Sequence, residues 1–537
     1  MTNANIQNER ILTYEPGSCE RVDLERELDR QAAQVVDIPV VVGGQRITSG
    51  EALPVTCPHD HRHRLANVFQ ASEANVNGAV KAANDAQRAW ASWSFEDRAA
   101  VFLKAADLLS GPWRQKLNAA TMLGQSKTAY QAEIDSACEL IDFLRWNVKF
   151  ARELQQTQPF SPGGMRNEFD YRPLEGFVYA VTPFNFTAIG GNLACAPALM
   201  GNPVVWKPAA TAALSNYYVL QLLEEAGLPP GVINFVPGDA RTVTSAALAS
   251  RSFAGLHFTG STAVFDTLWR SVAERLPDYQ NYPRLVGETG GKDFVLAHAS
   301  ADVDALAIAL LRGAFEYQGQ KCSAASRAYI PASLWPRVKA RLLDELATVK
   351  MGDVRDLSNF VGAVIDRRAF DRIGGYIEAA RHAPWTSIAA GGRRNAETGY
   401  FIEPTVIEVD DPGFVTMREE IFGPVLSVYT YRDEEWTGIL KLVDETSPYA
   451  LTGAVFATER SAIVEASAAL RFSAGNFYLN DKPTGAVVGQ QPFGGARRSG
   501  TNDKAGSSLN LLRWVSPRTI KETYVPAIDY RYPHMGN

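Results

Sequence analysis

Cys322 is the residue whose surroundings best suit covalent chemistry. It lies in the run Gln318-Gly319-Gln320-Lys321-Cys322-Ser323, one residue after a Lys and just beyond a glycine turn. A thiolate is a soft nucleophile, and a nearby ammonium such as Lys321, with main-chain N–H groups, is expected to favour it. The alternative is a buried structural cysteine, the commoner fate of a free thiol. We interpret Cys322 as a nucleophile, and Cys138 and Cys195 as structural.

A second run, Gly287-Glu288-Thr289-Gly290-Gly291-Lys292, places a carboxylate between glycines. Flanking glycines would let Glu288 swing into and out of a site. A carboxylate that activates water is a general base, and together with a thiol that accepts a carbonyl carbon it predicts catalysis through a thioester. The alternative for Glu288 is a solvated carboxylate in a glycine-rich loop.

A third run, Thr182-Pro183-Phe184-Asn185-Phe186, offers a side-chain amide. With the main-chain N–H of Cys322, the amide of Asn185 could stabilise the oxyanion that forms when a thiol attacks a carbonyl. Asn after Pro is also common in ordinary turns. The three runs together favour the catalytic interpretation of Asn185.

The segment that carries Asn185 alternates short apolar runs with helical stretches, which predicts βαβ units and a parallel sheet. The expected strands are 177–181, 204–206, 232–236 and 256–258, and a helix is expected over 212–226. Ligands of such sheets bind beyond the carboxyl ends of the strands. Asn185, Lys207, Gly260 and Ser261 all fall there.

A second alternation begins after residue 287, which predicts a second α/β domain that carries the thiol. Upstream, Ser94 with Asp97 is expected to start a helix that ends before Gly111-Pro112. Residues 155–174 and 505–537 fit neither alternation and are expected to be extended strands that pair away from the cores. The predicted division is 1–154 (a helical part of the first domain), 155–174 (a hairpin), 175–286 (the first sheet), 287–479 (the catalytic domain), 480–504 (a return to the first domain) and 505–537 (an arm).

Composition limits the class of protein. The chain has 537 residues, so more than one core is expected, and its net charge of −6 does not suggest a nucleic-acid or anionic-membrane partner. Five widely spaced cysteines predict a reducing compartment. The acidic N-terminal stretch matches neither a signal peptide nor a transit peptide. We expect a cytoplasmic enzyme, with a processed organellar form left open as an alternative.

The motifs occur in the order found in the aldehyde dehydrogenase superfamily, which the chain resembles over most of its length. They are Thr182-Pro183-Phe184-Asn185, Trp206-Lys207-Pro208-Ala209, Phe258-Thr259-Gly260-Ser261, Glu288-Thr289-Gly290-Gly291-Lys292, Gly319-Gln320-Lys321-Cys322 and Glu420-Ile421-Phe422-Gly423-Pro424. The resemblance implies a Rossmann-like NAD-binding domain, an α/β catalytic domain and an extended β arm for oligomerisation. It also implies a free carboxylic acid as product, because members that transfer the acyl group to coenzyme A typically lack a Glu at the position of Glu288.

The resemblance also supplies a cofactor site, since no G-x-G-x-x-G follows an expected strand. It implies that Gly260 and Ser261 face a pyrophosphate at a helix N-terminus, where anions are favoured. Lys207 would bind the adenine ribose, and Glu420 with Phe422 would hold the nicotinamide ribose. Thr182 and Pro183 complete the set of expected cofactor residues. Ala210 stands where many relatives carry a Glu for the adenine ribose. The resemblance implies NAD as the cofactor, with NADP as the alternative.

A narrower resemblance is to the branch of the family that oxidises L-glutamate γ-semialdehyde, the open form of Δ1-pyrroline-5-carboxylate. It is carried by Phe184-Asn185-Phe186, Lys321-Cys322-Ser323, residues 484–497 and Thr501-Asn502-Asp503-Lys504. The branch implies that main-chain amides of Gly485 and Ala486 bind the substrate α-carboxylate. Phe186 and Phe493 would enclose the aliphatic chain, and Lys321 and Ser323 would complete the pocket. Ala486 replaces a Ser of some members.

Two alternatives stay open. The same chemistry could act on another semialdehyde or an aliphatic aldehyde. The anchor loop at 484–493 distinguishes these substrates from the amino acid aldehyde, because only the latter needs its carboxylate bound. A non-catalytic protein on the same fold would be expected to lack the reactive residues, whereas Cys322, Asn185 and Glu288 are all present. The resemblance implies a homodimer or larger homo-oligomer and a functional link to a proline dehydrogenase.

Two further runs could be mistaken for sites. Cys57-Pro58-His59-Asp60-His61-Arg62-His63 contains metal-ligand residue types but has no second cluster, so a solvated turn is expected and no metal is predicted. Gly391-Gly392-Arg393-Arg394 precedes no helix signal and is expected to be a plain turn.

Overall fold

Buried apolar strands build the sheet of the first lobe. The computed structural model describes residues 6–536. Its first sheet has the order β11-β10-β7-β8-β9-β2-β3, and the five strands from β11 to β9 are parallel. The strands are β2 (Val40–Val42), β3 (Gln45–Ile47), β7 (Phe177–Val181), β8 (Val204–Lys207), β9 (Ile233–Phe235), β10 (Phe253–Thr259) and β11 (Arg284–Glu288). The four predicted strands between 177 and 258 are confirmed.

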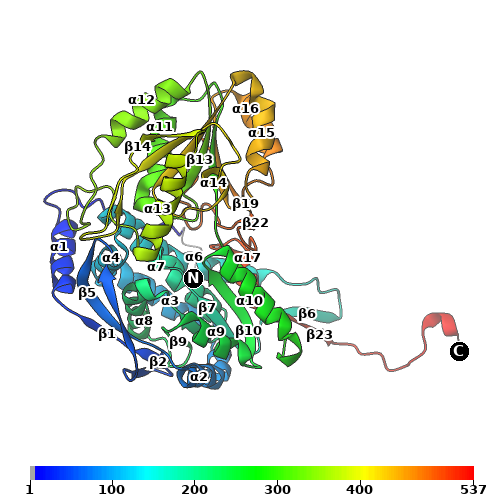
Figure 1. The fold of residues 1–537 in the computed structure, drawn as a ribbon. Helices are drawn as coiled ribbons and strands as arrows, with labels where there is room; N and C mark the ends of the chain where they lie inside the picture. Colours follow the sequence, from blue (N-terminus) through cyan, green and yellow to red (C-terminus); the bar gives the residue numbers. More distant parts are fainter. Residues whose placement is uncertain (1–5, 537) are drawn as a thin grey trace.

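Register in this sheet brings the motif residues to one edge. Val181 pairs with Lys207, and Thr259 pairs with Glu288. The carboxyl ends of β7, β8, β10 and β11 therefore lie side by side, and the helix after β10 starts at the same edge (Figure 1). The helices that connect these strands are α7 (Thr187–Leu199), α8 (Ala213–Ala226), α9 (Ala240–Ala249) and α10 (Thr262–Glu274).

The second lobe is built on another seven-stranded sheet, in the order β14-β17-β18-β13-β12-β20-β21. Its strands are β12 (Asp293–Ala297), β13 (Ala325–Pro331), β14 (Thr386–Ala390), β17 (Thr405–Val409), β18 (Val425–Tyr431), β20 (Thr452–Phe456) and β21 (Asn476–Leu479). Its helices are α11 (Val303–Phe315), α12 (Trp335–Leu346), α13 (Arg367–His382), α14 (Val415–Arg418), α15 (Trp436–Glu445) and α16 (Arg460–Ala469). Each lobe has buried apolar clusters of its own, so the predicted pair of α/β cores is confirmed.

The N-terminal 154 residues are less purely helical than predicted. The helices are α1 (Cys19–Ala32), α2 (Glu73–Ser92), α3 (Phe95–Ser110), α4 (Arg114–Gln125), α5 (Ala129–Ala132) and α6 (Leu140–Gln156), and the π-helical turn η1 (Glu133–Glu139) joins α5 to α6. Strands β1 (Val36–Ile38), β4 (Ala52–Cys57) and β5 (Asp60–Phe69) form a separate sheet, and β2 with β3 extends the first one. Ser94 caps α3 as predicted, accepting a hydrogen bond from the N–H of Asp97.

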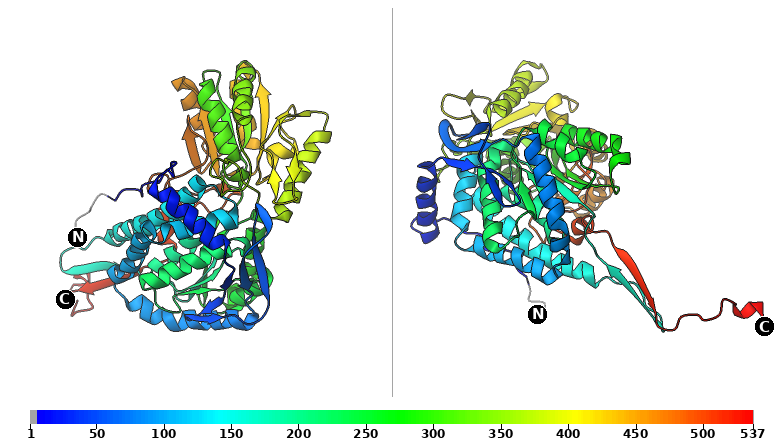
Figure 2. Two further views of the ribbon diagram at one scale, coloured as in Figure 1. Left: turned by 90° about the vertical axis from the view of Figure 1, so that its left-hand side faces the viewer. Right: turned by 90° about the horizontal axis from the view of Figure 1, so that it is seen from below.

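The expected arm is present, with two corrections. Strand β6 (Met165–Asp170) pairs antiparallel with β23 (Arg518–Thr523), and this two-stranded ribbon projects from the body together with the C-terminal residues (Figure 2). The predicted hairpin within residues 155–174 is wrong, because that segment holds one strand and its partner comes from the C-terminal arm. However, Ser508–Leu512 forms helix α17, and Trp514 is fully buried, so residues 505–514 are not an extended strand. Leu511 and Trp514 are three residues apart, so a short helix places both side chains on one face, where they pack in the first core.

The remaining short elements are β15 (Arg394–Asn395), β16 (Phe401–Ile402), β19 (Tyr449–Ala450), β22 (Ala496–Arg497) and the 3-10 turns η2 (Ala210–Ala212), η3 (Leu276–Asp278), η4 (Glu316–Gly319), η5 (Asp433–Glu435) and η6 (Pro533–Met535). Gly391 and Gly392 lie in the loop between β14 and β15, as predicted. No helix among residues 6–536 combines the length and hydropathy that a membrane span requires.

Candidate active site

Cys322 lies in a tight loop between α11 and β13. Helix α11 ends at Phe315, and the chain then turns through η4, where Tyr317 and Gln318 adopt the left-handed conformation with φ of 50° and 54°. Gly319 is required at the next position, because a Cβ atom there would lie 2.2 Å from the carbonyl oxygen of Gly423. The loop therefore presents Cys322, which is half-buried, at the junction of the two lobes.

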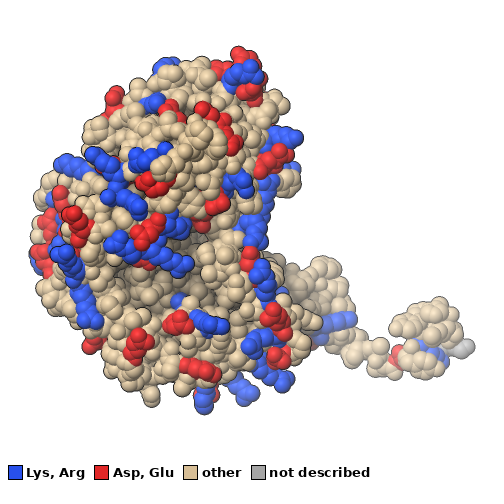
Figure 3. All heavy atoms as spheres, viewed as in Figure 1, with Lys and Arg blue, Asp and Glu red and all other residues tan. Residues whose placement is uncertain are grey.

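The Glu288 motif packs directly on this loop. A Cβ atom on Gly291 would lie 2.1 Å from the main-chain oxygen of Cys322, so only glycine permits the approach. Figure 3 shows that the face drawn there is hollowed between the two lobes, with Lys and Arg side chains along part of the rim. Two runs that are 34 residues apart in sequence, at 288 and 322, thus meet at one place.

The pKa of Cys322 is raised rather than lowered. Burial is the main cause, and the carboxyls of Asp293, Glu420 and Glu288 add to it, whereas the main-chain N–H of Ser323 offsets part of the rise. The expectation that Lys321 favours the thiolate is wrong: its ammonium is buried and bound 3.1 Å from Glu316 Oε2. In the free protein the thiol is therefore protonated at neutral pH, and its activation requires a proton acceptor.

Glu288 lies at the end of β11 beside the loop that follows residue 493. Its Oε2 accepts a hydrogen bond of 3.1 Å from the N–H of Gly495. Burial raises the pKa of Glu288 well above its usual range, and the Gly495 N–H and the Lys504 ammonium offset part of the rise. A carboxyl with a raised pKa is a stronger base once ionised, which suits proton abstraction from water.

Asn185 is buried just before α7 and points toward the nucleophile loop. Its side-chain amide donates a hydrogen bond of 3.1 Å to the carbonyl of Gln320, two residues before Cys322. This bond fixes the amide group next to the thiol loop and leaves its second N–H available. The position is compatible with the predicted oxyanion role, which stays a prediction.

The predicted pyrophosphate site lies at the start of α10. Ser261 is the exposed N-cap of this helix, and Gly260 donates its N–H to the carbonyl of Glu288 at 3.2 Å. A Cβ atom on Gly260 would lie 2.7 Å from the ring of Phe258, so the turn needs glycine. The exposed helix N-terminus fits an anionic group.

Lys207, at the end of β8, would hold the adenine ribose of a bound dinucleotide. Burial lowers the pKa of its ammonium, and Asp239 offsets part of that shift. Its Nζ donates to the carbonyl of Pro208 at 3.3 Å, which leaves donors for a ligand. Ala210 is exposed at the start of η2 and presents no charged group.

Glu420 and Phe422 approach from the second lobe. Glu420 Oε1 accepts a hydrogen bond of 2.9 Å from the N–H of Gly291, which joins it to the loop against Cys322. Phe422 has φ of 56° and lies edge-to-face with Phe184, with 5.8 Å between ring centroids. The exposed helix N-terminus at Ser261 and the carboxyl of Glu420 near the thiol loop thus suit a dinucleotide, and the individual cofactor roles stay predictions.

Thr182 and Pro183 shape the first lobe's side of this path. Thr182 Oγ1 accepts a hydrogen bond of 3.0 Å from Nε1 of Trp206, and its N–H donates to the carbonyl of Lys207 at 3.1 Å. Thr182 is therefore a buried link between β7 and β8, and Pro183, which is partly exposed, follows it.

The predicted substrate residues come from three segments. Phe186 precedes α7, and the ammonium of Lys127 lies 4.0 Å from its ring centroid. Ser323 Oγ lies 2.7 Å from Thr484 Oγ1, so the nucleophile loop touches the start of the anchor loop. Phe493 exchanges two main-chain hydrogen bonds with Ala505.

The anchor loop has a backbone conformation that can turn the main-chain N–H groups of Gly485 and Ala486 toward a ligand. Gly485 is exposed with φ of 92°, a left-handed value that favours glycine. Ala486 is half-exposed beside it. The ammonium of Lys482 donates to the carbonyl of Thr484 at 3.0 Å and adds positive charge next to these amides. The loop can therefore attract a carboxylate without a Ser at position 486.

Sequence reasoning missed two residues that hold the site together. Gln318 lies inside the thiol run and bonds to three main-chain groups outside it, and Thr484 bonds to Ser323. The sequence marks Gln318 and Thr484 only as polar residues inside the thiol run and the anchor loop. Their partners lie far away in sequence, so the pattern of the chain alone does not reveal them.

The expected solvated turn at residues 57–63 is wrong in part. Cys57 and His59 are each 2% exposed. His59 Nδ1 lies 3.2 Å from Ser126 Oγ, and its Nε2 lies 3.4 Å from Asp353 Oδ1. Burial lowers the pKa of His59 to about 4, so the ring is neutral at pH 7. Within residues 6–536, no cluster of His, Cys, Asp or Glu side chains suits a metal ion.

A comparison with protein families decides the class of this site. Residues 46–520 match the model of the aldehyde dehydrogenase family. The chain belongs to the aldehyde dehydrogenase family. The resemblance that six sequence motifs predicted is thereby confirmed, and with it the fold of two α/β lobes.

Individual family members are similar over the full chain. Delta-1-pyrroline-5-carboxylate dehydrogenase, mitochondrial, of Dictyostelium discoideum is 54% identical over 531 residues, covering 98% of this chain and 95% of that protein. The human protein of the same name is 50% identical and covers 99% and 94%. The solved Delta-pyrroline-5-carboxylate dehydrogenase of Mycobacterium tuberculosis, bound with NAD, is 56% identical with a TM-score of 0.96, covering 100% and 99%.

Proposed function

We propose that this aldehyde dehydrogenase oxidises L-glutamate γ-semialdehyde, formed by opening of Δ1-pyrroline-5-carboxylate, to L-glutamate with NAD. The observation that carries the proposal is the 2.7 Å contact between Ser323 and Thr484, which joins the nucleophile loop to the anchor loop. The names of the similar proteins and the NAD in the solved mycobacterial structure support it. The reaction is the second oxidation of proline breakdown.

In the first half of the reaction, Cys322 Sγ attacks the aldehyde carbon and forms a tetrahedral adduct. The thiol of Cys322 is protonated in the free protein and only half-buried, so its proton passes to water as the S–C bond forms. The amide of Asn185 and the N–H of Cys322 stabilise the oxyanion. Bound NAD supplies the hydride acceptor, after which the substrate carbon remains on the sulfur as a thioester.

In the second half, water hydrolyses the thioester. Glu288 removes a proton from the water, the new C–O bond forms and the C–S bond breaks. Glu288 then returns the proton to the sulfur, which regenerates the thiol and frees the carboxylate for the next turnover. The glycines on both sides of Glu288 allow it to reach the acyl carbon. Because Glu288 is present, the product is a free carboxylic acid.

The anchor loop binds the charged end of the substrate. The main-chain N–H groups of Gly485 and Ala486, supported by Lys482, bind the α-carboxylate. Phe186 and Phe493 enclose the methylene chain between that end and the thiol. An amino acid aldehyde needs this combination of a polar anchor and an apolar corridor, whereas a simple aldehyde does not.

Assembly, partners and location are further parts of the proposal. The projecting two-stranded ribbon of β6 and β23 is suited to joining subunits in a homodimer or larger homo-oligomer. Proline utilization A of Bdellovibrio bacteriovorus, whose chain is matched over 54% of its length at 29% identity, supports a link to proline oxidation. We propose a cytoplasmic location, although relatives from Dictyostelium and human carry "mitochondrial" in their names.

The test compares two aldehydes in the full-length protein. Formation of reduced dinucleotide is followed with NAD and either Δ1-pyrroline-5-carboxylate or propanal, with Cys322→Ala as control. The proposal expects saturable turnover with a much higher kcat/KM for the pyrroline substrate, and none in the variant. Replacing Gly485 with Leu should raise the KM for that substrate alone. Equal efficiency with both aldehydes would contradict the proposed substrate.

A further inference from the structure

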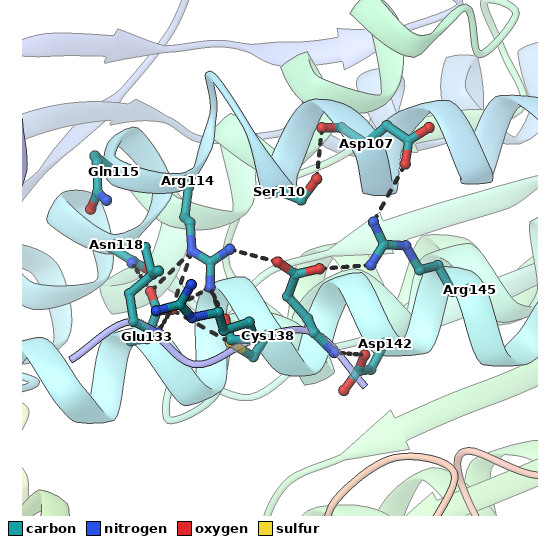
Figure 4. Close-up of polar contacts among 12 residues, drawn as sticks. Asp107, Ser110, Arg114, Gln115, Asn118, Glu133, Cys138, Asp142 and Arg145 are labelled. Atoms are coloured by element: carbon teal, nitrogen blue, oxygen red, sulfur yellow. Dashed lines mark hydrogen bonds and ion pairs between the residues drawn. The ribbon is translucent and has the colours of Figure 1, made fainter. Parts of the chain in front are cut away.

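The N-terminal residues 8–14 form a strap that lies across helices α4 and α6 and the turn η1 (Figure 4). The strap is fixed at its far end by Glu133, which is fully buried. Glu133 accepts hydrogen bonds from the N–H of Leu12 at 2.8 Å and from the hydroxyl of Tyr14 at 2.7 Å. The strap is therefore anchored in the core of the first lobe.

Charged groups hold the middle of the strap. The guanidinium of Arg114 binds Glu133 and also Glu9 Oε1 at 2.7 Å. Arg145 binds the other carboxylate oxygen of Glu9 at 2.6 Å. Arg114 donates further to the carbonyl of Arg10 at 2.5 Å. With Arg114 and Glu133 both buried, these bonds are poorly screened by water and fix the path of the strap.

Asn8, at the near end of the strap, connects it to the anchor loop. Its side-chain amide donates to Asp142 Oδ2 at 2.8 Å and to the main-chain carbonyl of Val488 at 2.7 Å. Its Oδ1 accepts a hydrogen bond of 2.9 Å from Nε2 of Gln490. One residue thus binds helix α6 and two positions of the anchor loop, 480 residues away in sequence.

The anchor loop is held on this side by the burial of Val488 in the first core and by packing on α6, not by regular secondary structure. Residues 484–491 form no helix or strand, and Gly485 and Gly489 both have positive φ. Gly489 lies against the ring of Trp146, where a Cβ atom would be 2.5 Å from Cε2. Trp146 supports the loop from the side of α6, and Asn8 fixes its position along the helix.

We propose that Asn8 is a positioning residue for substrate specificity: by holding Val488 and Gln490 against α6, it sets the Gly485 and Ala486 amides for the substrate carboxylate. The inference rests on the proposed function, since it assumes that this loop binds the α-carboxylate. Asn8 itself does not touch the reacting atoms. Its loss should therefore weaken binding of an aldehyde that carries a carboxylate and spare one that lacks it.

The experiment measures kcat and KM of the full-length protein for Δ1-pyrroline-5-carboxylate and for propanal. Asn8→Ala removes all three bonds, Asn8→Asp keeps the shape but loses both donors, and Gln7→Ala is the matched control at the neighbouring exposed residue. Both Asn8 variants are expected to raise the KM for the pyrroline substrate roughly five- to tenfold, with kcat within about twofold and propanal kinetics unchanged. Gln7→Ala should match the parent protein.

Three results would overturn the inference. If Asn8→Ala kept the KM for the pyrroline substrate while the parent protein preferred that substrate, the loop would not need the strap. If both aldehydes lost activity equally, together with a lower Tm, Asn8 would act on stability alone. If the parent protein itself showed no preference for the pyrroline substrate, the proposed function would fail first and the inference with it.

Discussion

The side-chain amide of Gln318 donates a hydrogen bond of 3.0 Å to the main-chain carbonyl of Ser126, which lies 192 residues earlier in the chain. The same amide donates to the carbonyl of Ala363 at 2.7 Å, and Gln318 Oε1 accepts from the N–H of Gly362 at 3.0 Å. A left-handed residue four positions before the nucleophile is thus held by both lobes. Such strain near a catalytic group persists only where the surroundings enforce it.

Replacing Gln318 should misplace the thiol. In Gln318→Ala the left-handed turn loses its three bonds, and a shift of the loop by about 1 Å can cost on the order of 100-fold in rate. We expect kcat to fall by roughly that factor with little change in KM, measured by steady-state kinetics. Gln318→Glu, which keeps the acceptor and loses both donors, should show a similar loss. The exposed Gln34→Ala serves as control, and normal kcat in Gln318→Ala would contradict the positioning role.

Alkylation of Cys322 should become faster as the pH rises. Burial and nearby carboxyls raise the pKa of this thiol, so its thiolate fraction still increases above pH 8 in the protein without dinucleotide. The measurement is the rate of iodoacetamide labelling at Cys322, followed by peptide mass spectrometry. The exposed Cys19 reports reagent access in the same sample. A labelling rate that levels off below pH 7 would show that the thiol is activated before any ligand binds.

Glu288→Gln should separate the two halves of the reaction. The amide retains the shape of the carboxyl but cannot remove a proton from water, so hydrolysis of the thioester should slow by about 100-fold or more. Intact-protein mass spectrometry should then detect the acyl group on Cys322 during turnover. Glu274→Gln, at an exposed position on α10, is the control. Steady turnover by Glu288→Gln without accumulated acyl-enzyme would exclude the general-base role.

The turnover rate should rise with pH on the acidic side of its profile. The reactive form of Glu288 is the carboxylate, and burial raises its pKa, so the rise is displaced above the range of an ordinary Glu. The kcat of the parent protein is measured across pH 5 to 9. In Glu288→Gln the residual rate should lack this limb. A profile already flat at pH 5 would mean that the carboxyl is ionised there.

Stability should decrease in mild acid because of His59. The pKa of His59 is lowered by burial to about 4, while an unfolded His titrates near 6.5, so the unfolded state binds the proton first. As the pH falls from about 6.5 toward 4, the free energy of unfolding should drop by up to about 3 kcal/mol. The Tm of His59→Gln should depend less on pH in this window, with the exposed His382→Gln as control. Identical pH dependence in parent and variant would contradict this assignment.

The secondary structure of the two lobes could be predicted because its signals are local. The apolar runs from Phe177 to Val181 and from Val204 to Trp206 become neighbouring parallel strands, and the loops after such strands share one edge. The strand pattern alone therefore predicts that Asn185, Lys207 and Gly260 lie near each other. Helix α17 was missed because five residues are too few for a helical period to be distinguished from an extended run.

The amino-acid sequence by itself determined the chemistry available to this protein: a thiol, a carboxylate, an amide and a glycine-rich anchor, each next to a strand or turn of its own. Only the tertiary structure decided how these groups behave. It turned Lys321 toward Glu316, buried His59 against Ser126, and placed Asn8 on the carbonyl of Val488. Burial and long-range contact set these outcomes, because a pKa or a hydrogen bond depends on groups that meet only when the chain has folded.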